Sequence, residues 1–503
     1  MLLLGYDIGS SSVKASLLDG ATGKALASAY YPKMEMNIVA KQSGWAEQHP
    51  ETWWEALRMA TQELFNKAGK IDKQAIKAIG IAYQMHGLVL IDKDQQVIRP
   101  SIIWCDSRAV NIGRQAFEEL GRENCLSHLL NSPGNFTASK LKWVRENEPF
   151  VYKKIHKIML PGDYIAMKLS GEVQTTISGL SEAILWDFKE QKVAEQVLDY
   201  FEFKPSIIPD IVPTFSEQGQ LKESSAKELD LPAGIPICYR AGDQPNNAFS
   251  LNVLKAGEIA ATAGTSGVVY GVGNETRYDP ESRVNTFAHV NHSLEHNSLG
   301  TLLCINGSGI LYSWAKRNLG SIDYEKMNAL AAQAPIGASG IRVLPFGNGA
   351  ERILQDRNIG SHFSNINFNT HSNAHLFRGM LEGIVYSLKY GLEIMQGVGV
   401  QPQVIRAGHA NLFLSEIFRE ALASIAKVSI ELYNTDGAQG AARGAGVGAG
   451  YYTLDNAFVG LEKIGEVEPN KFLKAQYRYA YNKWKQLLDW KIQAMANEEE
   501  EGE

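Results

Sequence analysis

The 503-residue sequence lacks the features that mark three large classes of protein. Its four cysteines include no Cys-x-x-Cys pair, so neither a disulfide framework nor a zinc site is expected. With 49 Lys and Arg against 55 Asp and Glu, the net charge of -6 argues against nucleic acid as the main partner, because binding to phosphate backbones needs concentrated positive charge. No apolar run reaches the length of a membrane helix, and Leu2–Leu4 is too short for a signal peptide. We therefore expect a cytoplasmic location, with neither a nucleic acid nor a membrane as partner.

The length and composition indicate two large domains. With 503 residues, of which 45% are hydrophobic and 21% charged, the chain can bury more than one core. Strand-like and helix-like patterns alternate along it, which is typical of α/β layers. The proline-rich stretch 203–236 is typical of a loop-rich approach to a domain junction. We therefore place an N-terminal domain at 1–245, a C-terminal domain at 246–490 and an acidic, solvated tail at 491–503.

Three stretches have clear helical periodicity. They are Pro50–Lys67, Leu376–Met395 and Leu414–Ala426. In the first, Trp53 and Trp54 belong to an apolar stripe, and Gly69 is placed to end the helix. The two tryptophans are most simply explained as core residues of the N-terminal domain.

Two distant segments share a pattern of apolar strand, small-residue turn and apolar strand. They are Gly5–Lys14 at the start and Glu258–Tyr270 in the middle of the chain. In the first turn, Gly9 lets a ligand approach the backbone, and the hydroxyls of Ser10–Ser12 can donate hydrogen bonds to phosphate. Asp7 can orient a hydrated Mg²⁺, and Lys14 adds a positive charge.

Taken alone, one such turn is more often an ordinary hairpin. The second copy, with Gly264, Thr265 and Ser266 in its turn, favours two phosphate-binding half-sites that enclose a nucleoside triphosphate. Neither turn contains Gly-x-x-x-x-Gly-Lys-Ser/Thr, and no Gly-x-Gly-x-x-Gly follows an N-terminal strand. The sequence thus predicts an ATP site of another kind.

Six segments, spaced over most of the chain, carry a family resemblance. They are Asp7-x-Gly-Ser-Ser, Gly44-Trp45-Ala46-Glu47-Gln48-His49-Pro50-Glu51-Thr52-Trp53-Trp54, Gln84-Met85-His86-Gly87, Gly242-Asp243-Gln244, Gly264-Thr265-Ser266-Gly267 and Leu381-Glu382-Gly383-Ile384. In this order they resemble the FGGY carbohydrate kinases, from residue 1 to about residue 450. The Gln-Met-His-Gly segment is most similar to members that phosphorylate xylulose. The resemblance implies an α/β fold of two ribonuclease-H-like (actin-like ATPase) domains flanking a catalytic cleft.

Asp243 is the candidate catalytic base. It follows a strand-like stretch and a glycine, a geometry that exposes a carboxylate in a cleft. An aspartate there can accept the proton of a sugar hydroxyl during phosphoryl transfer, whereas the alternative from the residues alone is a turn or helix-capping aspartate. The resemblance implies the catalytic role, with Asp7 as the second catalytic residue and both carboxylates as Mg²⁺ ligands. It also makes Gln244 and Asn246 candidate sugar contacts.

The sugar pocket is expected at Gln84, Met85 and His86. They follow a buried-strand pattern, and α/β proteins bind ligands at the carboxyl ends of strands. From the residues alone, a histidine or methionine here is more often satisfied core. The resemblance implies instead that His86 bonds a sugar hydroxyl and that Met85 packs on the carbon skeleton. Asp106 and Arg108 are expected to form a structural ion pair lining the site.

The resemblance also implies which residues hold the nucleotide. They are Gly9, Ser10, Ser11 and Lys14 of the first hairpin, Gly264, Thr265 and Ser266 of the second, and Gly307, Gly408 and Asn411 further along. The adenosine turn departs from the glycine-rich pattern of the family, because Arg406 and Ala407 stand where glycines are usual, and this leaves the nucleotide preference open. Leu344–Arg352 resembles a Gly-Glu-Arg loop of the family and is interpreted as a structural turn.

The expected function is ATP- and Mg²⁺-dependent phosphorylation of a ketopentose, converting D-xylulose to D-xylulose 5-phosphate. The alternatives are a family member acting on another ketose, a polyol or glycerol, a catalytically silent sensor of sugar or ATP, and an actin-like filament protein. The presence of both Asp7 and Asp243 argues against the sensor, and Gln84–Gly87 would have no purpose in a filament. The sequence leaves the oligomeric state open, a homodimer included.

Overall fold

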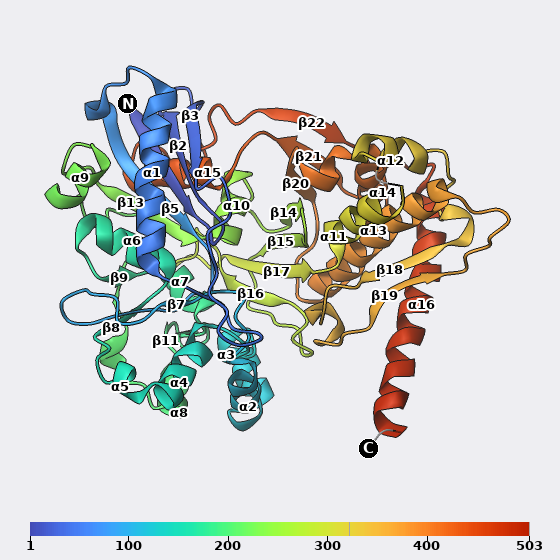
Figure 1. Cartoon of the computed structure of the whole chain (residues 1–503), viewed down its shortest axis with the longest axis horizontal. Coiled ribbons are helices and arrows are strands. Elements are labelled where there is room, and N and C mark those ends of the chain that lie inside the picture. The colour runs from blue at the N-terminus through green and yellow to red at the C-terminus, as the bar shows by residue number, and fades with distance from the viewer. Residues whose placement is uncertain (321, 502–503) are drawn as a thin grey trace.

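The computed structural model describes residues 1–320 and 322–501. Among them, two large β-sheets lie side by side with helices against their faces (Figure 1). The N-terminal sheet, from residues 2–242, lies on the left of the figure, and the C-terminal sheet, from residues 258–467, lies toward its centre and right. An insert of short helices and strands lies below the first sheet. The predicted α/β fold with two sheet-containing halves is confirmed.

The strand order of the N-terminal sheet brings the ends of three parallel strands together. In spatial order the strands are β13 (Ile237–Gly242), β5 (Ile76–Tyr83), β1 (Leu2–Ile8), β2 (Val13–Asp19) and β3 (Ala25–Tyr31). β13, β5 and β1 run parallel, whereas β2 is antiparallel to both of its neighbours. The parallel strands β1, β5 and β13 are buried on both faces, as their apolar runs require, whereas the edge strand β3 is largely exposed. The carboxyl ends of β1, β5 and β13 therefore meet at one edge of the sheet.

Two helices from distant parts of the chain cover the two faces of this sheet. α1 (Pro50–Ala68) packs on β2 and β3 with Trp53 and Trp54 buried, and it ends at Gly69 as predicted. α15 (Gly437–Gly448) packs on β1 and β5, so close that a Cβ on Gly5 would lie 2.0 Å, and one on Gly80 1.9 Å, from backbone oxygens of the helix. Only glycine permits this approach.

The C-terminal sheet is joined to the first sheet through helices. In spatial order its strands are β16 (Asn285–Ala288), β17 (Leu299–Ile305), β15 (Gly267–Gly273), β14 (Glu258–Ala263), β20 (Val404–Gly408), β21 (Ser429–Tyr433) and β22 (Lys463–Val467). α10 (Asp243–Ser250) packs on α15 and also contacts β5 of the first sheet and β14 of the second. α10 and α15 thus lie between the halves, and α10 begins at Asp243.

The remaining C-terminal elements enclose a second hydrophobic core. They are α11 (Ser308–Asn318), α12 (Tyr324–Ala331), β18 (Arg342–Phe346), β19 (Gly360–Ser364), α13 (Asn373–Gly397), α14 (Glu416–Ala426) and α16 (Lys474–Glu501). α13 and α14 confirm the two predicted helices, and α14 begins at Glu416 because Ser415 caps it by accepting the N–H of Phe418.

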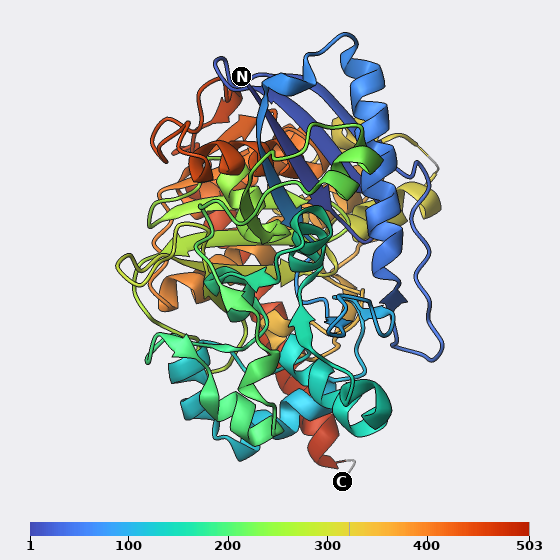
Figure 2. The same cartoon turned by 90° about the vertical axis from the view of Figure 1, so that its left-hand side faces the viewer.

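The insert shares its hydrophobic core with one face of the N-terminal sheet. Figure 2 shows most of it beneath that sheet, whereas α9 packs beside α1. Its helices are α2 (Val110–Glu119), α3 (Arg122–Leu129), α4 (Thr137–Asn147), α5 (Pro149–Tyr152), α6 (Pro161–Ser170), α7 (Ile177–Glu182), α8 (Glu195–Phe201) and α9 (Glu223–Leu229). The short strands of this region are β4 (Glu47–Gln48), β6 (Val89–Ile91), β7 (Ser101–Ile102), β8 (Lys157–Met159), β9 (Gln174–Thr175), β10 (Trp186–Asp187), β11 (Lys192–Val193) and β12 (Asp210–Ile211).

The domain limits expected at 245 and 490 stay a prediction. α15 comes from the second half of the chain and packs on the first sheet, so the two halves are interlocked rather than consecutive. The acidic segment 491–503 continues helix α16 as far as Glu501, and residues 502–503 lie outside those described. Among the described residues, no helix combines the length and the apolarity needed to cross a bilayer.

Candidate active site

Three side chains predicted for the site lie at the shared edge of β1, β5 and β13. Asp7 lies near the end of β1, Gln84 directly follows β5, and Asp243 directly follows β13. The N–H of Gln84 donates to the carbonyl oxygen of Ile8 at 2.8 Å, which extends the pairing of β5 with β1 by one residue. The parallel register therefore brings the predicted base, the predicted metal ligand and the start of the predicted sugar segment to one place.

The carboxylates of Asp7 and Asp243 share an electrostatic environment. Burial raises the pKa of Asp243 to about 7, and the negative charge of Asp7 adds to that rise. Burial also raises the pKa of Asp7, opposed by the charge of Lys14 and reinforced by that of Asp436. Two carboxylates of like charge at one place suit a divalent cation, which would lower the pKa of both groups.

The small number of carboxylates at this place fits Mg²⁺. Among the described residues, no three histidines, cysteines or acidic residues gather closely enough to cage a metal ion. Mg²⁺ commonly takes one or two protein carboxylates and completes its shell with water and substrate phosphate oxygens. The carboxylate of Asp7, on β1, lies against the first residue of α15. A Cβ on Gly437 would come within 2.4 Å of Oδ2 of Asp7, so this glycine leaves room for the carboxylate.

The first predicted phosphate hairpin is the turn between β1 and β2. The N–H of Gly9 donates to the carbonyl oxygen of Ser12 at 3.1 Å and closes the turn. Gln48 donates to the carbonyl oxygen of Ser10 at 2.7 Å, and the indole of Trp104 donates to the Ser10 hydroxyl at 3.2 Å. Lys14 pairs in register with Asp7 on the adjacent strand. The hairpin is thus fixed by Gln48 and Trp104.

The second hairpin, between β14 and β15, borders a cavity of about 540 Å³. The residues that line it are Ala263, Gly264, Thr265, Gly309, Ile310, Tyr312, Ser313, Arg317, Tyr324, Asn328, Asn411, Leu412, Leu414 and Ser415. The N–H of Ile310 donates to Thr265 at 2.9 Å, and a Cβ on Gly309 would lie 1.9 Å from the carbonyl oxygen of Gly264, so only glycine fits there. α11 therefore begins against the hairpin.

One wall of this cavity is aromatic. The rings of Tyr312 and Tyr324 stack with centroids 5.9 Å apart, and the hydroxyl of Tyr312 donates to Asn328 at 3.0 Å. An apolar floor with a few polar groups suits a nucleoside. Of the predicted nucleotide residues, Gly264, Thr265 and Asn411 line the cavity, whereas Ser266, Gly307 and Gly408 do not.

Sequence reasoning missed the cavity residues on α11 and α12. Gly309 stands two residues after the predicted Gly307, and its Asn-Gly-Ser-Gly context was a signal for it. Gly307 instead holds its place because a Cβ would lie 1.7 Å from the carbonyl oxygen of Pro345. Tyr312, Tyr324 and Asn328 have no sequence signal, because only packing of the two helices brings them to the hairpin.

The two departures from the adenosine turn lie in a strand. Arg406 and Ala407 belong to β20, and neither lines the cavity. The guanidinium of Arg406 pairs with Glu431 at 2.8 Å and with Glu258 at 3.1 Å, on the neighbouring strands, while Ala407 is buried in the core. The side chains of Arg406 and Ala407 therefore do not shape the cavity.

His86 is held in a strained backbone conformation with φ of 61°. Its N–H donates to the carboxylate of Glu182 at 2.9 Å, and Lys140 donates to its carbonyl oxygen at 2.8 Å. Glu182 is itself held by the hydroxyl of Tyr83 at 2.8 Å. These buried contacts fix the peptide on both sides, and strain of this kind is often found at binding sites.

The imidazole of His86 is neutral and oriented. Burial lowers the pKa of His86 to about 3, with the charges of Lys140 and Arg352 acting in the same direction. Its Nδ1 lies 3.0 Å from the carbonyl oxygen of Glu182, which can only accept, so Nδ1 carries the proton and Nε2 is left as an acceptor. The ring packs between Phe136 and Phe287, with centroids 4.7 and 5.4 Å away.

Met85 and Gln84 complete this region. Met85 is buried against the backbone of Gly242, where a Cβ would lie 2.6 Å from its Cγ. Gln84 is only 3% exposed, and neither its amide nitrogen nor its amide oxygen has a hydrogen-bond partner among the described residues. Gln244 follows the predicted base, and its hydrogen bonds oppose the rise in the pKa of Asp243.

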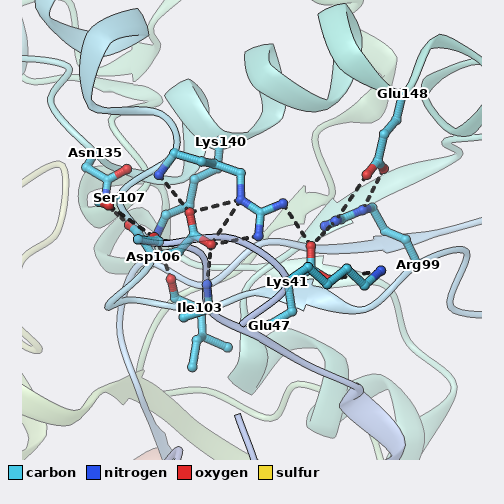
Figure 3. Close-up of polar contacts among 12 residues, drawn as sticks. Lys41, Glu47, Arg99, Ile103, Asp106, Ser107, Asn135, Lys140 and Glu148 are labelled. Atoms are coloured by element: carbon cyan, nitrogen blue, oxygen red, sulfur yellow. Dashed lines mark hydrogen bonds and ion pairs between the residues drawn. The ribbon is translucent and has the colours of Figure 1, made fainter. Parts of the chain in front are cut away.

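A buried network of charges connects the segment before α1 to the insert (Figure 3). Asp106 accepts from Arg108 at 2.7 Å and from the N–H of Ala46 at 2.5 Å. Glu47 accepts from Arg108 at 2.8 Å and from Arg99 at 2.5 Å. The predicted structural ion pair of Asp106 and Arg108 is confirmed, and it belongs to a larger network that fixes the loop beside the first hairpin.

Sequence comparisons relate the chain to carbohydrate kinases. The sequence model of the N-terminal domain of the FGGY family of carbohydrate kinases matches residues 2–250. A xylulose kinase of Escherichia coli (strain K12) is 28% identical over 446 residues, which are 88% of this chain and 88% of that protein.

Solved structures share the fold over almost the whole chain. A xylulose kinase from Rhodospirillum rubrum has a TM-score of 0.87 at 23% identity, covering 97% of this chain and 98% of that chain. A glycerol kinase from Plasmodium falciparum, solved with ADP, has a TM-score of 0.87 at 19% identity with the same coverage. The fold is thus that of the actin-like ATPases. The sequence match identifies residues 2–250 as the N-terminal domain of an FGGY carbohydrate kinase, and the likeness to the Escherichia coli protein extends over 88% of the chain.

Proposed function

We propose that the chain catalyses the ATP-dependent phosphorylation of D-xylulose at O5, giving D-xylulose 5-phosphate. The observation that carries the proposal is the position of Asp243. It lies at the sheet edge that also carries the first phosphate hairpin and the Gln84–His86 segment. The likeness to the Escherichia coli xylulose kinase supports the choice of sugar.

In the proposed mechanism, Asp243 is the general base. The hydroxyl on C5 donates a hydrogen bond to its carboxylate, and the proton moves to Asp243 as the oxygen attacks the γ-phosphorus of ATP. The bond from that phosphorus to the β–γ bridging oxygen breaks, and ADP leaves. A base with a pKa of about 7 is half deprotonated at neutral pH and holds a proton more readily than an exposed aspartate. The like charge of Asp7 contributes to this basicity.

The sugar is oriented by groups that follow β5. The Nε2 atom of His86 accepts a hydrogen bond from a sugar hydroxyl, and the side chain of Met85 contacts the carbon skeleton. The unpartnered amide of Gln84 supplies a donor and an acceptor, and Gln244 adds a second amide beside the base. Buried polar groups left without partners favour a ligand that satisfies them.

The phosphates are held by the two hairpins. Backbone N–H groups and hydroxyls of Ser10, Ser11 and residues 264–266, together with Lys14, balance the negative charge that develops on the transferring group. Gly9 lets the phosphates approach the backbone. The adenosine lies in the cavity beside Gly309 and Tyr312, with Asn411 at its edge. Asp7 and Asp243 would hold Mg²⁺, which would offset the negative charge of the phosphates.

A test of the proposed function is ADP release measured with a panel of sugars and polyols. The panel contains D-xylulose, D-ribulose, L-ribulose, D-fructose, xylitol and glycerol, each at several concentrations with saturating MgATP. We expect D-xylulose to give the highest kcat/KM. A tenfold preference for glycerol or a ketohexose would assign the kinase to another substrate, and no ADP release with any compound would favour the silent sensor.

A further inference from the structure

Glu182 is a buried acidic residue, only 1% exposed, beside both the proposed base and the sugar segment. Its Oε1 atom accepts the hydroxyl of Tyr83 at 2.8 Å. A Cβ on Gly242, the residue before Asp243, would lie 3.3 Å from the same oxygen. The Oε2 atom accepts the N–H of His86 at 2.9 Å. The carboxyl group therefore contacts the end of β5 and His86, and it lies beside the end of β13, where the base follows.

Glu182 binds His86 a second time, through its own carbonyl oxygen. This oxygen lies 3.0 Å from Nδ1 of His86. Glu182 is the last residue of α7, and the final carbonyl groups of a helix have no N–H partner within it. The oxygen is thus available to hold the proton of Nδ1, which leaves Nε2 as an acceptor. One residue therefore fixes both the backbone and the tautomer of His86.

The position of α7 is fixed by the edge of the C-terminal sheet. Ser178 donates to the carbonyl oxygen of Ala288 at 3.0 Å, and Ser181 accepts the N–H of Ala288, also at 3.0 Å. Phe287, the residue before Ala288 in β16, packs against the ring of His86 with centroids 5.4 Å apart. The helix that carries Glu182 thus also holds the strand whose phenylalanine packs on the imidazole.

We infer that Glu182 is a positioning residue of the sugar site, which keeps His86 oriented with Nε2 free for a sugar hydroxyl at a fixed place beside the base. The inference rests on the proposed function, in which His86 binds the sugar and Asp243 accepts the proton of the hydroxyl on C5. A residue with a φ of 61° keeps this conformation only while its surroundings hold it. Loss of the Glu182 carboxyl group should therefore displace the imidazole. It should spare the nucleotide, because Glu182 does not line the nucleotide cavity.

The experiment measures the KM values for D-xylulose and ATP in the parent, Glu182→Leu and Glu182→Gln. Leucine has a similar size but makes no hydrogen bonds, whereas glutamine can accept the N–H of His86 and donate to the Tyr83 hydroxyl. We expect Glu182→Leu to raise the KM for D-xylulose at least tenfold, while its KM for ATP changes less than twofold. Glu182→Gln should stay within threefold of the parent for both substrates. Glu190→Leu, at an exposed position of the same insert, is the control and should match the parent.

A double variant tests whether Glu182 acts through His86. His86→Ala alone should raise the KM for D-xylulose, and adding Glu182→Leu to it should change that KM less than twofold further, because the oriented imidazole is already missing. If Glu182→Leu melts at a lower temperature than the parent, Tyr83→Phe repeats the comparison. It removes only the hydroxyl that holds Glu182, and a rise of at least threefold in the KM for D-xylulose is then required of it.

Three results would overturn the inference. The first is a KM for D-xylulose within twofold of the parent in Glu182→Leu. The second is an equal loss in Glu182→Leu and Glu182→Gln, which would assign the effect to charge rather than to hydrogen bonds. The third is full additivity of the losses in the double variant, which would place the action of Glu182 away from His86. Failure of the parent to phosphorylate D-xylulose, or an unchanged KM in His86→Ala, contradicts the proposed function instead, and both are measured before the Glu182 variants.

Discussion

The negative charge of Asp7 raises the pKa of Asp243, although the two residues are 236 positions apart. Asp7 lies on β1 and Asp243 directly follows β13, and β5 separates these two strands. Burial is the larger cause, and together they bring the pKa of Asp243 to about 7. A carboxyl group in this state is a stronger base than an exposed aspartate and is still available at neutral pH. The same pair provides two oxygen ligands for a divalent cation. Proximity of these carboxylates thus connects proton acceptance with metal binding.

The pH dependence of sugar phosphorylation should follow Asp243. Because the base acts only when deprotonated, and its pKa is raised to about 7, kcat/KM for D-xylulose should fall about tenfold for each pH unit below that value and level off above it. Initial rates between pH 5.5 and 9, at low sugar and low MgATP, measure this. Saturating MgATP should move the acid limb to lower pH, since a bound cation favours the charged carboxylate. A rate that is constant from pH 5.5 to 8 would contradict the assignment.

The free energy of unfolding should change with pH in the direction opposite to that of the activity. The carboxyl of Asp243 keeps its proton up to about pH 7 when folded but loses it near pH 4 when unfolded, so the folded state binds more protons across that window. The free energy of unfolding therefore falls as pH rises through it. At pH 8, Asp243→Asn should melt a few degrees higher than the parent, with the difference vanishing near pH 4. Asp455→Asn, at an exposed position, is the control and should melt with the parent. A lower melting temperature for Asp243→Asn at pH 8 would show that the carboxylate is stabilising.

Lys140 should position the sugar segment. Its ammonium is fully buried and donates to the carbonyl oxygens of His86 and Ile103, at 2.8 and 3.1 Å. Lys140→Met leaves the carbonyl oxygen of His86 without its donor and removes one of the two donors to Ile103, whose carbonyl oxygen also accepts the N–H of Asp106. The left-handed His86 is then released, so unfolding should become about 1–3 kcal/mol easier. The KM for D-xylulose should also rise, with little change in the KM for ATP. Chemical denaturation and steady-state kinetics measure the two effects.

The matched control for this prediction is Lys142→Met on the same helix. Lys142 pairs with Glu146 at 3.1 Å near the surface, and such a pair contributes about 0.3–0.5 kcal/mol. If Lys140→Met behaves like this control in both assays, Lys140 does not hold His86.

Arg406 should affect stability and leave nucleotide choice alone. Arg406→Gly introduces the residue usual in the family, but it removes contacts with Glu258 and Glu431 and leaves two carboxylates close together. We expect a loss of about 1–3 kcal/mol in unfolding free energy, and an ATP-to-GTP ratio of kcat/KM within threefold of the parent. Asn328→Leu is the positive control. Asn328 lines the cavity, so this variant should raise the KM for ATP. A tenfold change in preference for Arg406→Gly would place its side chain in the pocket.

Most of the fold was predictable from sequence because local patterns carry it. The first hairpin, the helix that begins at Pro50 and the strand before Gln84 depend on alternation, capping and turn residues that a single segment contains. The placement of α15 on the first sheet was not predictable in this way, since it depends on close approach to Gly5 and Gly80 from more than 350 residues away.

The site was predictable where a motif marks a strand end. Asp7, Gln84 and Asp243 come together because adjacent parallel strands end there. The aromatic wall at Tyr312 and Tyr324 was not predicted, because only the packing of helices brings these two rings together. Assignment of their roles, like those of the predicted site residues, stays a prediction until variants are measured.

The most direct test of the mechanism is the turnover of Asp243→Asn with D-xylulose. The amide keeps the size of the side chain but cannot accept the proton, and loss of a general base costs about a hundredfold to ten-thousandfold in rate, or roughly 3–5 kcal/mol. We predict that kcat falls by this amount while the Kd for D-xylulose, measured by calorimetry, stays within threefold of the parent and the variant melts cooperatively. Retention of more than about a tenth of parental kcat, which corresponds to less than about 1.4 kcal/mol of barrier, would contradict the assignment of Asp243 as the base.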